Sequence, residues 1–262
     1  MPASLTNAVR ERLAKPEELA LGIGIRQSRT VDIASIMKAA GYDWLFLDLE
    51  HNSMDLDTAV QISVAALAVG IAPFVRVPAR QYWLATRALD GGALGIVMPH
   101  VDTPEEAQAI VRHMRYPPVG QRSIAGGLPH LGYATISMGE TCAAINAATF
   151  LTVMLETPQA IANAEKIAAV PGIDSLLIGT SDLSIEMGIP GQLGHERIVE
   201  AYRTVIAACR AQGKHPGMGG VYEPELMRRY IGMGMRYLLT GSDLGFMASG
   251  ARECAKAMRA LL

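Results

Sequence analysis

The chain has 262 residues, of which 50% are hydrophobic and 18% are charged, so it can bury a large core and is not expected to be disordered. Its 23 lysine and arginine residues and 25 aspartate and glutamate residues give a net charge of −2, which leaves no basic excess to attract nucleic acid or a membrane surface. The sequence contains no unbroken apolar run of about 18 residues, which is the length needed to span a bilayer, and its polar N-terminal segment lacks the apolar stretch of a signal peptide.

Short apolar runs alternate with amphipathic stretches along the whole chain. Runs that are apolar on both faces are typical of strands in a parallel sheet, and the amphipathic stretches are typical of the helices that cover such a sheet. Glycine follows several of these stretches where helices commonly end, as at Gly41, Gly70 and Gly213. The predicted strands cover residues 18–27, 42–50, 71–77, 94–101, 150–157, 174–182, 214–221 and 236–243. The clearest predicted helices cover residues 30–41, 56–70, 82–92, 103–115 and 195–213.

Eight strands separated by helices, without the glycine-rich fingerprint of a dinucleotide-binding fold, favour a (β/α)8 barrel over an open, doubly wound sheet. No linker, low-complexity tract or change in composition indicates a second domain, so residues 1–262 are expected to form one barrel domain. Residues 117–148 are longer than a simple connection and are rich in glycine and proline in their first half, a composition typical of a functional loop.

Several of the predicted strands end in ionisable or polar residues. Because the carboxyl ends of the strands meet at one mouth of a (β/α)8 barrel, where active sites lie, these side chains are expected to converge on a reaction site. The residues concerned are Asp48, Glu50, His51, Arg76, His100, Asp102, Glu156, Thr157, Ser181 and Asp182.

Two of these acids suggest a metal site. Glu156 and Asp182 follow successive strands, so their carboxylates can face each other across the rim and hold an octahedral divalent cation such as Mg²⁺ or Mn²⁺. The alternative is a pair of solvated acids, or acids paired with nearby basic residues.

Arg76 stands in a buried strand, where it has two possible roles. It either stabilises a substrate carboxylate or an enolate, or it forms a structural ion pair with Asp48 or Glu50.

The remaining candidates also have two interpretations each. His51 is either a general base or the cap of the following helix. Asp90 either orients a base or is an ordinary residue of the last turn of its helix, and the residues alone favour the second interpretation.

The three cysteines, Cys142, Cys209 and Cys254, lack the spacing of a zinc site or a redox pair and are expected to be reduced thiols of a cytoplasmic protein.

Five segments carry a combined resemblance: FLDLEHNSMD, PFVRVP, residues 92–123, VMLET and GIDSLLIGTSDLSIEMG. In order and spacing, over residues 20–245, the sequence resembles the HpcH/HpaI family of metal-dependent, class II pyruvate aldolases. The resemblance implies a barrel of the phosphoenolpyruvate/pyruvate superfamily and a divalent cation (Mg²⁺, Mn²⁺ or Co²⁺). It also implies a lyase similar to 4-hydroxy-2-oxoheptanedioate aldolase. Such an enzyme reversibly cleaves 4-hydroxy-2-oxo acids to pyruvate, or an analogue such as hydroxypyruvate, and an aldehyde through a metal-stabilised enolate.

The resemblance assigns roles at the carboxyl ends of three strands. Glu156 and Asp182 match the metal ligands of the family. Arg76 matches an arginine that contacts the keto-acid oxygen and the enolate. The main chain around Ser181 and Asp182 matches a turn that holds the carboxylate of pyruvate.

It also assigns roles in proton transfer. His51 matches a histidine that handles protons through a metal-bound water. Asp48 and Asp90 match acids that support this histidine, and Asp90 is expected to reach it from a neighbouring subunit.

The sequence departs from the family pattern at two positions. Met154 stands where members often have glutamine, and Thr180 stands where they often have proline, which leaves the identity of the substrate open. His130 belongs to a tract that resembles a subgroup, and with Arg122 it is expected to meet the aldehyde half of the substrate or a distal carboxylate.

Other functions stay open beside this one. A sugar-acid aldolase resembling 2-dehydro-3-deoxyglucarate aldolase would use the same chemistry. A CoA-ester lyase of the citrate lyase or malyl-CoA lyase type would need basic groups for CoA phosphate, and the sequence shows no clear basic cluster. A metal-binding or regulatory barrel without turnover is a third possibility. The family implies a homo-oligomer, commonly a hexamer built as a trimer of dimers, in which residues 246–262 either pack on another subunit or cover their own barrel.

Overall fold

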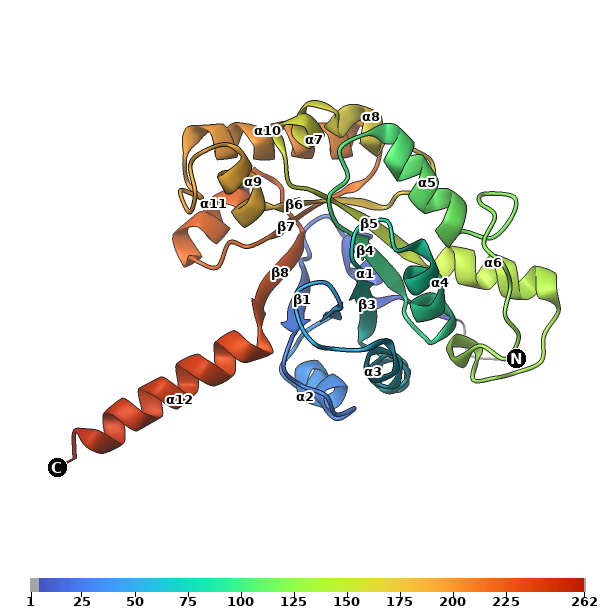
Figure 1. The fold of residues 1–262 in the computed structure, drawn as a ribbon, viewed down its shortest axis with the longest axis horizontal. Coiled ribbons are helices and arrows are strands. Elements are labelled where there is room, and N and C mark those ends of the chain that lie inside the picture. The colour runs from blue at the N-terminus through green and yellow to red at the C-terminus, as the bar shows by residue number, and fades with distance from the viewer. Residues whose placement is uncertain (1–4, 262) are drawn as a thin grey trace.

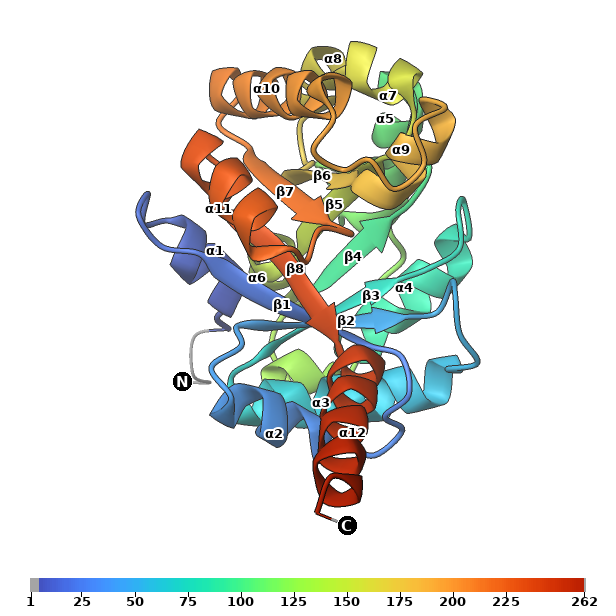
Figure 2. The ribbon, with the colours of Figure 1, turned by 90° about the vertical axis from the view of Figure 1, so that its left-hand side faces the viewer.

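This computed structural model describes residues 5–261. Its strands close into a barrel in the order β1 to β8, as the sequence predicts (Figure 2). All neighbouring strands are parallel, and β8 pairs with β1, so the sheet has no free edge. The strands are β1 (Ala20–Ile25), β2 (Trp44–Asp48), β3 (Ala72–Arg76), β4 (Gly95–Met98), β5 (Phe150–Leu155), β6 (Ser175–Gly179), β7 (His215–Gly219) and β8 (Tyr237–Ser242).

Helices connect successive strands, and their ends follow local capping signals. Thr103 and Glu106 form a capping box at the start of α5, and Ser137 and Glu140 form one at the start of α6, so residues 138–148, the last third of residues 117–148, are a helix and not a loop. The helices are α1 (Ala8–Leu13), α2 (Ile33–Ala39), α3 (Leu56–Val69), α4 (Tyr82–Asp90), α5 (Pro104–Met114), α6 (Met138–Ala148), α7 (Pro158–Ala162), α8 (Ala164–Ala168), α9 (Thr180–Glu186), α10 (Glu196–Ala211), α11 (Pro224–Met233) and α12 (Asp243–Arg259), with a 3₁₀ turn at Pro129–Leu131.

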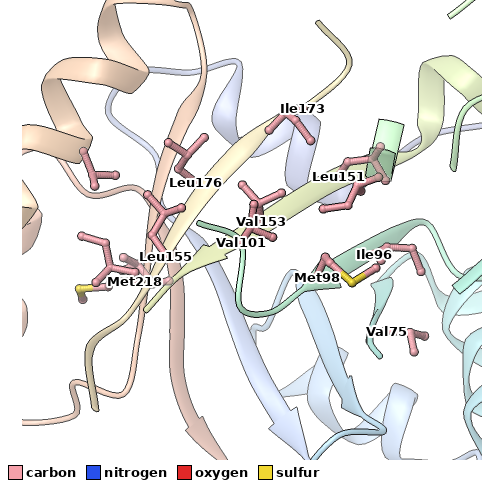
Figure 3. Close-up of a cluster of buried hydrophobic side chains, with 14 of the residues drawn as sticks. Val75, Ile96, Met98, Val101, Leu151, Val153, Leu155, Ile173, Leu176 and Met218 are labelled. Atoms are coloured by element: carbon pink, nitrogen blue, oxygen red, sulfur yellow. The ribbon is translucent and has the colours of Figure 1, made fainter. Parts of the chain in front are cut away.

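The strands bury side chains on both faces, and each face has its own core. The outward-facing aliphatic side chains, including Val153 and Leu155, form a layer between the sheet and the helices (Figure 3). Inside the barrel, at its amino-terminal end, four aromatic rings form a floor; the rings of Trp44 and Tyr237 stack with centroids 4.5 Å apart. A Cβ atom at position 22 would lie 2.0 Å from the Trp44 ring, so Gly22 makes room for this floor. The floor consists of Trp44, Phe74, Phe150 and Tyr237. The carboxyl end of the barrel is left for a site.

The last helix does not cover the barrel. α12 runs away from the end of β8 (Figure 1), and none of its residues with described side chains is buried. Its exposed apolar residues include Leu244, Phe246, Met247 and Met258. The alternative in which residues 246–262 cover their own sheet is therefore wrong for the described part of this segment, which ends at Leu261. None of the helices within residues 5–261 is long and apolar enough to cross a membrane.

Candidate active site

A buried arginine and a buried aspartate join the carboxyl ends of β2 and β3. Asp48 and Arg76 are neighbours in the strand register, so their side chains leave the sheet side by side. The Nε and Nη2 atoms of Arg76 donate to the two carboxylate oxygens of Asp48 at 2.9 and 2.7 Å, and its Nη1 lies 3.1 Å from the Glu50 carboxylate. The guanidinium also lies over the ring of Phe46. Arg76 is thus a structural ion-pair partner and, at the same time, a wall of the cavity described below.

This ion pair fixes the charge state of Asp48. Burial alone raises the pKa of a carboxyl group, but the hydrogen bonds and charge of Arg76 outweigh it and hold the pKa of Asp48 below its ordinary value. The backbone N–H groups of Glu50 and His51 add to this effect. Asp48 is therefore an ionised clamp that holds the Arg76 guanidinium in one orientation.

His51 lies at the rim of the same cavity. Its Nε2 atom is 3.6 Å from the Glu50 carboxylate, and about half of its side chain is exposed. It does not cap the following helix, because Asp55 accepts the hydrogen bond from Thr58 N–H at the start of α3. The capping interpretation of His51 is therefore wrong, and its half-exposed ring faces the cavity.

A buried carboxylate and a histidine meet at the ends of β4 and β5. The N–H of His100 donates to Glu156 at 2.8 Å, and the two ring nitrogens of His100 lie 3.2 Å from Glu156 and 3.4 Å from Glu50. Burial raises the pKa of Glu156; His100 opposes this shift, and the nearby Asp182 and Glu50 carboxylates add to it. The charges of two further acids thus act on the buried Glu156 carboxylate, and His100 lies between Glu156 and Glu50.

Close packing fixes Glu156 against the start of the next helix. β6 ends at Gly179, where an added Cβ atom would lie 2.6 Å from Cγ of Glu156 and 2.7 Å from its Oε1. Only glycine fits this approach without moving Glu156. Ser181 and Asp182 follow in the first turn of α9 and line the cavity.

The two departures from the family pattern both lie at this cavity. Met154 lines its wall with a buried apolar side chain. The buried hydroxyl group of Thr180 shares a hydrogen bond of 2.7 Å with the Tyr202 hydroxyl, which comes from α10. The turn that lacks the proline is therefore anchored by a side-chain hydrogen bond.

The mouth of the barrel contains a cavity of about 300 Å³, a size that suits a small metabolite. It gathers residues from seven of the eight strand ends, all but that of β4, and it includes an arginine that the sequence patterns did not single out, Arg26. That residue directly follows β1, so its place after an apolar run was the available signal. The polar and charged lining residues are Arg26, His51, Arg76, Thr180, Ser181, Asp182, Tyr222 and Ser242.

The acids at this mouth fit a divalent cation. Glu156 and Asp182 offer hard carboxylate oxygens, and the pKa of Glu156 is raised mainly by burial, with a smaller contribution from the charges of Asp182 and Glu50. Within residues 5–261, no group of three or more histidine, cysteine, aspartate or glutamate side chains is arranged to hold a metal ion. A cation here would thus have two protein ligands, and water and substrate would complete its coordination.

Three of the predicted residues lie elsewhere. Asp90 ends α4 and pairs with Arg122 at 2.5 Å, and the Arg122 guanidinium lies over the ring of Tyr116. His130 contacts the carbonyl oxygen of Ala93, just before β4. Because α4 and α5 run back from the mouth, these residues are at the amino-terminal end of the barrel. The structure does not bring Asp90, Arg122 or His130 into the mouth of their own barrel, and any role for them there requires a neighbouring subunit.

The fold and this mouth define a (β/α)8-barrel enzyme. Residues 26–248 match the HpcH/HpaI aldolase/citrate lyase family, and the chain belongs to that family, as its motifs predict. It is accordingly a lyase of the aldolase class.

Known proteins resemble the chain along nearly its whole length. It is 37% identical to 4-hydroxy-4-methyl-2-oxoglutarate aldolase from Chaetomium globosum, over 97% of this chain and 94% of the relative. It is 33% identical to hydroxypyruvate/pyruvate aldolase from Cupriavidus necator, over 87% of this chain and 84% of the relative. The crystal structure of an HpcH/HpaI aldolase from Desulfitobacterium hafniense DCB-2 superimposes with a TM-score of 0.90 at 26% identity, covering 96% of each chain.

Proposed function

We propose that the protein reversibly cleaves 4-hydroxy-2-oxo acids to pyruvate, or a close analogue such as hydroxypyruvate, and an aldehyde, with a divalent cation bound by Glu156 and Asp182. The observation that carries this proposal is the buried Arg76, which Asp48 locks in the wall of the cavity that Asp182 also lines. A cationic donor fixed in this way stabilises an enolate oxygen without reorganising during the reaction. The names of the two aldolase relatives support the reaction class.

Each group has a distinct task in the cleavage direction. A bound cation (Mg²⁺, Mn²⁺ or Co²⁺) supplies Lewis-acid stabilisation of the charge that develops on the 2-oxo group. Main-chain N–H groups at Ser181 and Asp182 bind the carboxylate of the 2-oxo acid, and Arg76 donates hydrogen bonds to its 2-oxo oxygen. His51 accepts the proton of the 4-hydroxyl group, directly or through a water molecule. The bond between C3 and C4 then breaks, the aldehyde leaves, and a proton returns to C3 to give pyruvate.

The Glu156→Ala variant tests this assignment. Pyruvate release from 4-hydroxy-2-oxoglutarate is followed by proton NMR, with chelator-treated protein to which Mg²⁺, Mn²⁺ or Co²⁺ is added. The variant should remain folded and lose the metal-dependent turnover of the wild type. Glu165→Ala is the matched control, because it removes the same charge from an exposed position on α8. Metal-dependent turnover at the wild-type rate in folded Glu156→Ala protein would contradict the assignment.

We also propose that the protein acts as a homo-oligomer, a hexamer built as a trimer of dimers, in the cytoplasm. The exposed apolar residues of α12 would pack on another subunit, and Asp90 would support His51 of a neighbour. The free state of Cys142, Cys209 and Cys254 agrees with a reducing compartment. Met247 and Met258 are 61% and 57% exposed. A Met247→Glu/Met258→Glu double variant puts charge on this apolar surface and should lower the molar mass measured by static light scattering. An unchanged mass would contradict the role of α12.

A further inference from the structure

Arg26 occupies the side of the mouth that lies across from Glu156. It directly follows β1 and lines the cavity. In the closed order β1 to β8, β1 is four strands from β5 in both directions. Arg26 therefore lies across the barrel from the strand that ends beside Glu156, and the side chains of His51 and Arg76 come from the strands between them.

The guanidinium of Arg26 makes one long contact with the rest of the fold. Its Nε lies 3.4 Å from Asp48, whose carboxylate oxygens already accept two shorter hydrogen bonds from Arg76. Within residues 5–261, neither terminal nitrogen of Arg26 has a hydrogen-bond or ion-pair partner, and its side chain is 40% exposed. All three nitrogens of Arg76, in contrast, face carboxylates. Arg26 thus brings two accessible terminal nitrogens without partners to the cavity, while its Nε faces Asp48.

The main chain that carries this guanidinium is held in place. The Asp243 carboxylate, at the start of α12, accepts hydrogen bonds from the N–H groups of Arg26, Gln27 and Ser28 at 2.9, 3.0 and 2.7 Å. The carbonyl oxygen of Arg26 accepts a further hydrogen bond from Arg29. Only the Arg26 side chain is left to adjust to a ligand, and this limits the ordering cost of binding.

We infer that Arg26 binds a second carboxylate on the aldehyde half of the substrate, so that the enzyme prefers 4-hydroxy-2-oxo dicarboxylic acids. The inference rests on the proposed function, which places the 2-oxo acid end of the substrate beside Glu156 and Asp182. From there the carbon chain extends past Arg76 toward β1 and ends at Arg26. A guanidinium fork binds a carboxylate through two parallel hydrogen bonds, which a neutral tail cannot accept. Arg26 thereby takes the role that the sequence predicted for Arg122 and His130.

Two pairs of compounds that differ only in this carboxylate test the inference. The substrates 4-hydroxy-2-oxoglutarate and 4-hydroxy-2-oxopentanoate differ by a carboxylate in place of a methyl group, and so do the inhibitors 2-oxoglutarate and 2-oxopentanoate. The quantities to compare are the ratio of kcat/KM for the substrates and the ratio of inhibition constants for the inhibitors. The proteins are the wild type, Arg26→Met, Arg26→Lys and, as a charge-matched control, Arg228→Met on the exposed face of α11.

The wild type should favour both dicarboxylates, and Arg26→Met should lower both preferences by about 10- to 100-fold, mainly through KM. Arg26→Lys should lose less, since it keeps the charge without the fork, and Arg228→Met should match the wild type. If Arg26→Met does not fold, the loss in Arg26→Lys decides the question. The inference about Arg26 would be overturned if the wild type cleaved both substrates equally well, or if the ratios were equal in all four proteins. Either result would leave the proposed function standing. A wild type that cleaves neither substrate would reject the proposed function itself.

Discussion

Replacing Gly179 with alanine tests whether the position of Glu156 controls the reaction. The added Cβ would lie 2.6 Å from Cγ of Glu156, whereas ordinary contact begins at 3.4 Å, so the carboxylate must move by about 0.8 Å. The N–H of His100 donates to the other carboxylate oxygen, Oε2, and Glu156 is 2% exposed, so the carboxylate cannot move without losing contacts. Displacements near 1 Å cost about 100-fold in activity, and overpacking costs about 1–3 kcal/mol of unfolding free energy.

The assay measures kcat/KM for aldol cleavage, the affinity for Mn²⁺ by calorimetry, and stability by urea unfolding. Gly139→Ala is the matched control, because a Cβ at this position in α6 would meet nothing within 4 Å. We expect Gly179→Ala to lose about 100-fold in kcat/KM and to bind Mn²⁺ more weakly, while the control changes neither. Folded Gly179→Ala protein with Mn²⁺ affinity and activity within threefold of the wild type would refute the assignment of Glu156.

Two further predictions concern buried polar pairs near the site. Asp48→Asn removes one partner of a buried ion pair and should lower the unfolding free energy at pH 7 by about 3 kcal/mol in urea titrations. Because the folded pKa of Asp48 lies below the unfolded value of about 3.9, the ion pair stabilises the protein fully above that pH. The difference in unfolding free energy between Asp48→Asn and the wild type should narrow as the pH falls through the pKa of Asp48 in the folded protein. A difference that stays constant with pH would contradict this explanation. Tyr202→Phe and Thr180→Val should each cost about 1–2 kcal/mol, since each leaves a buried hydroxyl without its partner. The double variant should cost less than the sum, and strict additivity would argue against the bond.

The barrel and much of its mouth could be predicted because both depend on local sequence signals. Apolar runs of strand length locate the strands, and the ionisable residues that end them must meet at one end of a parallel barrel. Asp48, Arg76 and Asp182 therefore lie at the mouth where their sequence positions predict. The chemistry assigned to them remains a prediction.

The remaining features depend on contacts between distant residues. Arg122 and His130 lie in a segment of irregular structure, and nothing local shows that this segment lies at the amino-terminal end of the barrel. The requirement for Gly179 arises from Glu156, which comes from another strand, and the orientation of α12 depends on what surrounds the barrel. Arg26 was missed although it lies near the end of a predicted strand, because only the structure shows that Arg76 makes the two short hydrogen bonds to Asp48 and that the terminal nitrogens of Arg26 have no partner within residues 5–261.

Solvent deuterium exchange into the methyl group of pyruvate, followed by proton NMR, tests the central claim most directly. It reports enolate formation without requiring the correct aldehyde. The experiment uses chelator-stripped protein, to which Mg²⁺, Mn²⁺ or Co²⁺ is added separately. We expect exchange only when a divalent cation is present, and we expect the Arg76→Met variant to lose it. Folded wild-type protein that exchanges with none of the three cations, or that exchanges equally well without Arg76, would contradict the central claim.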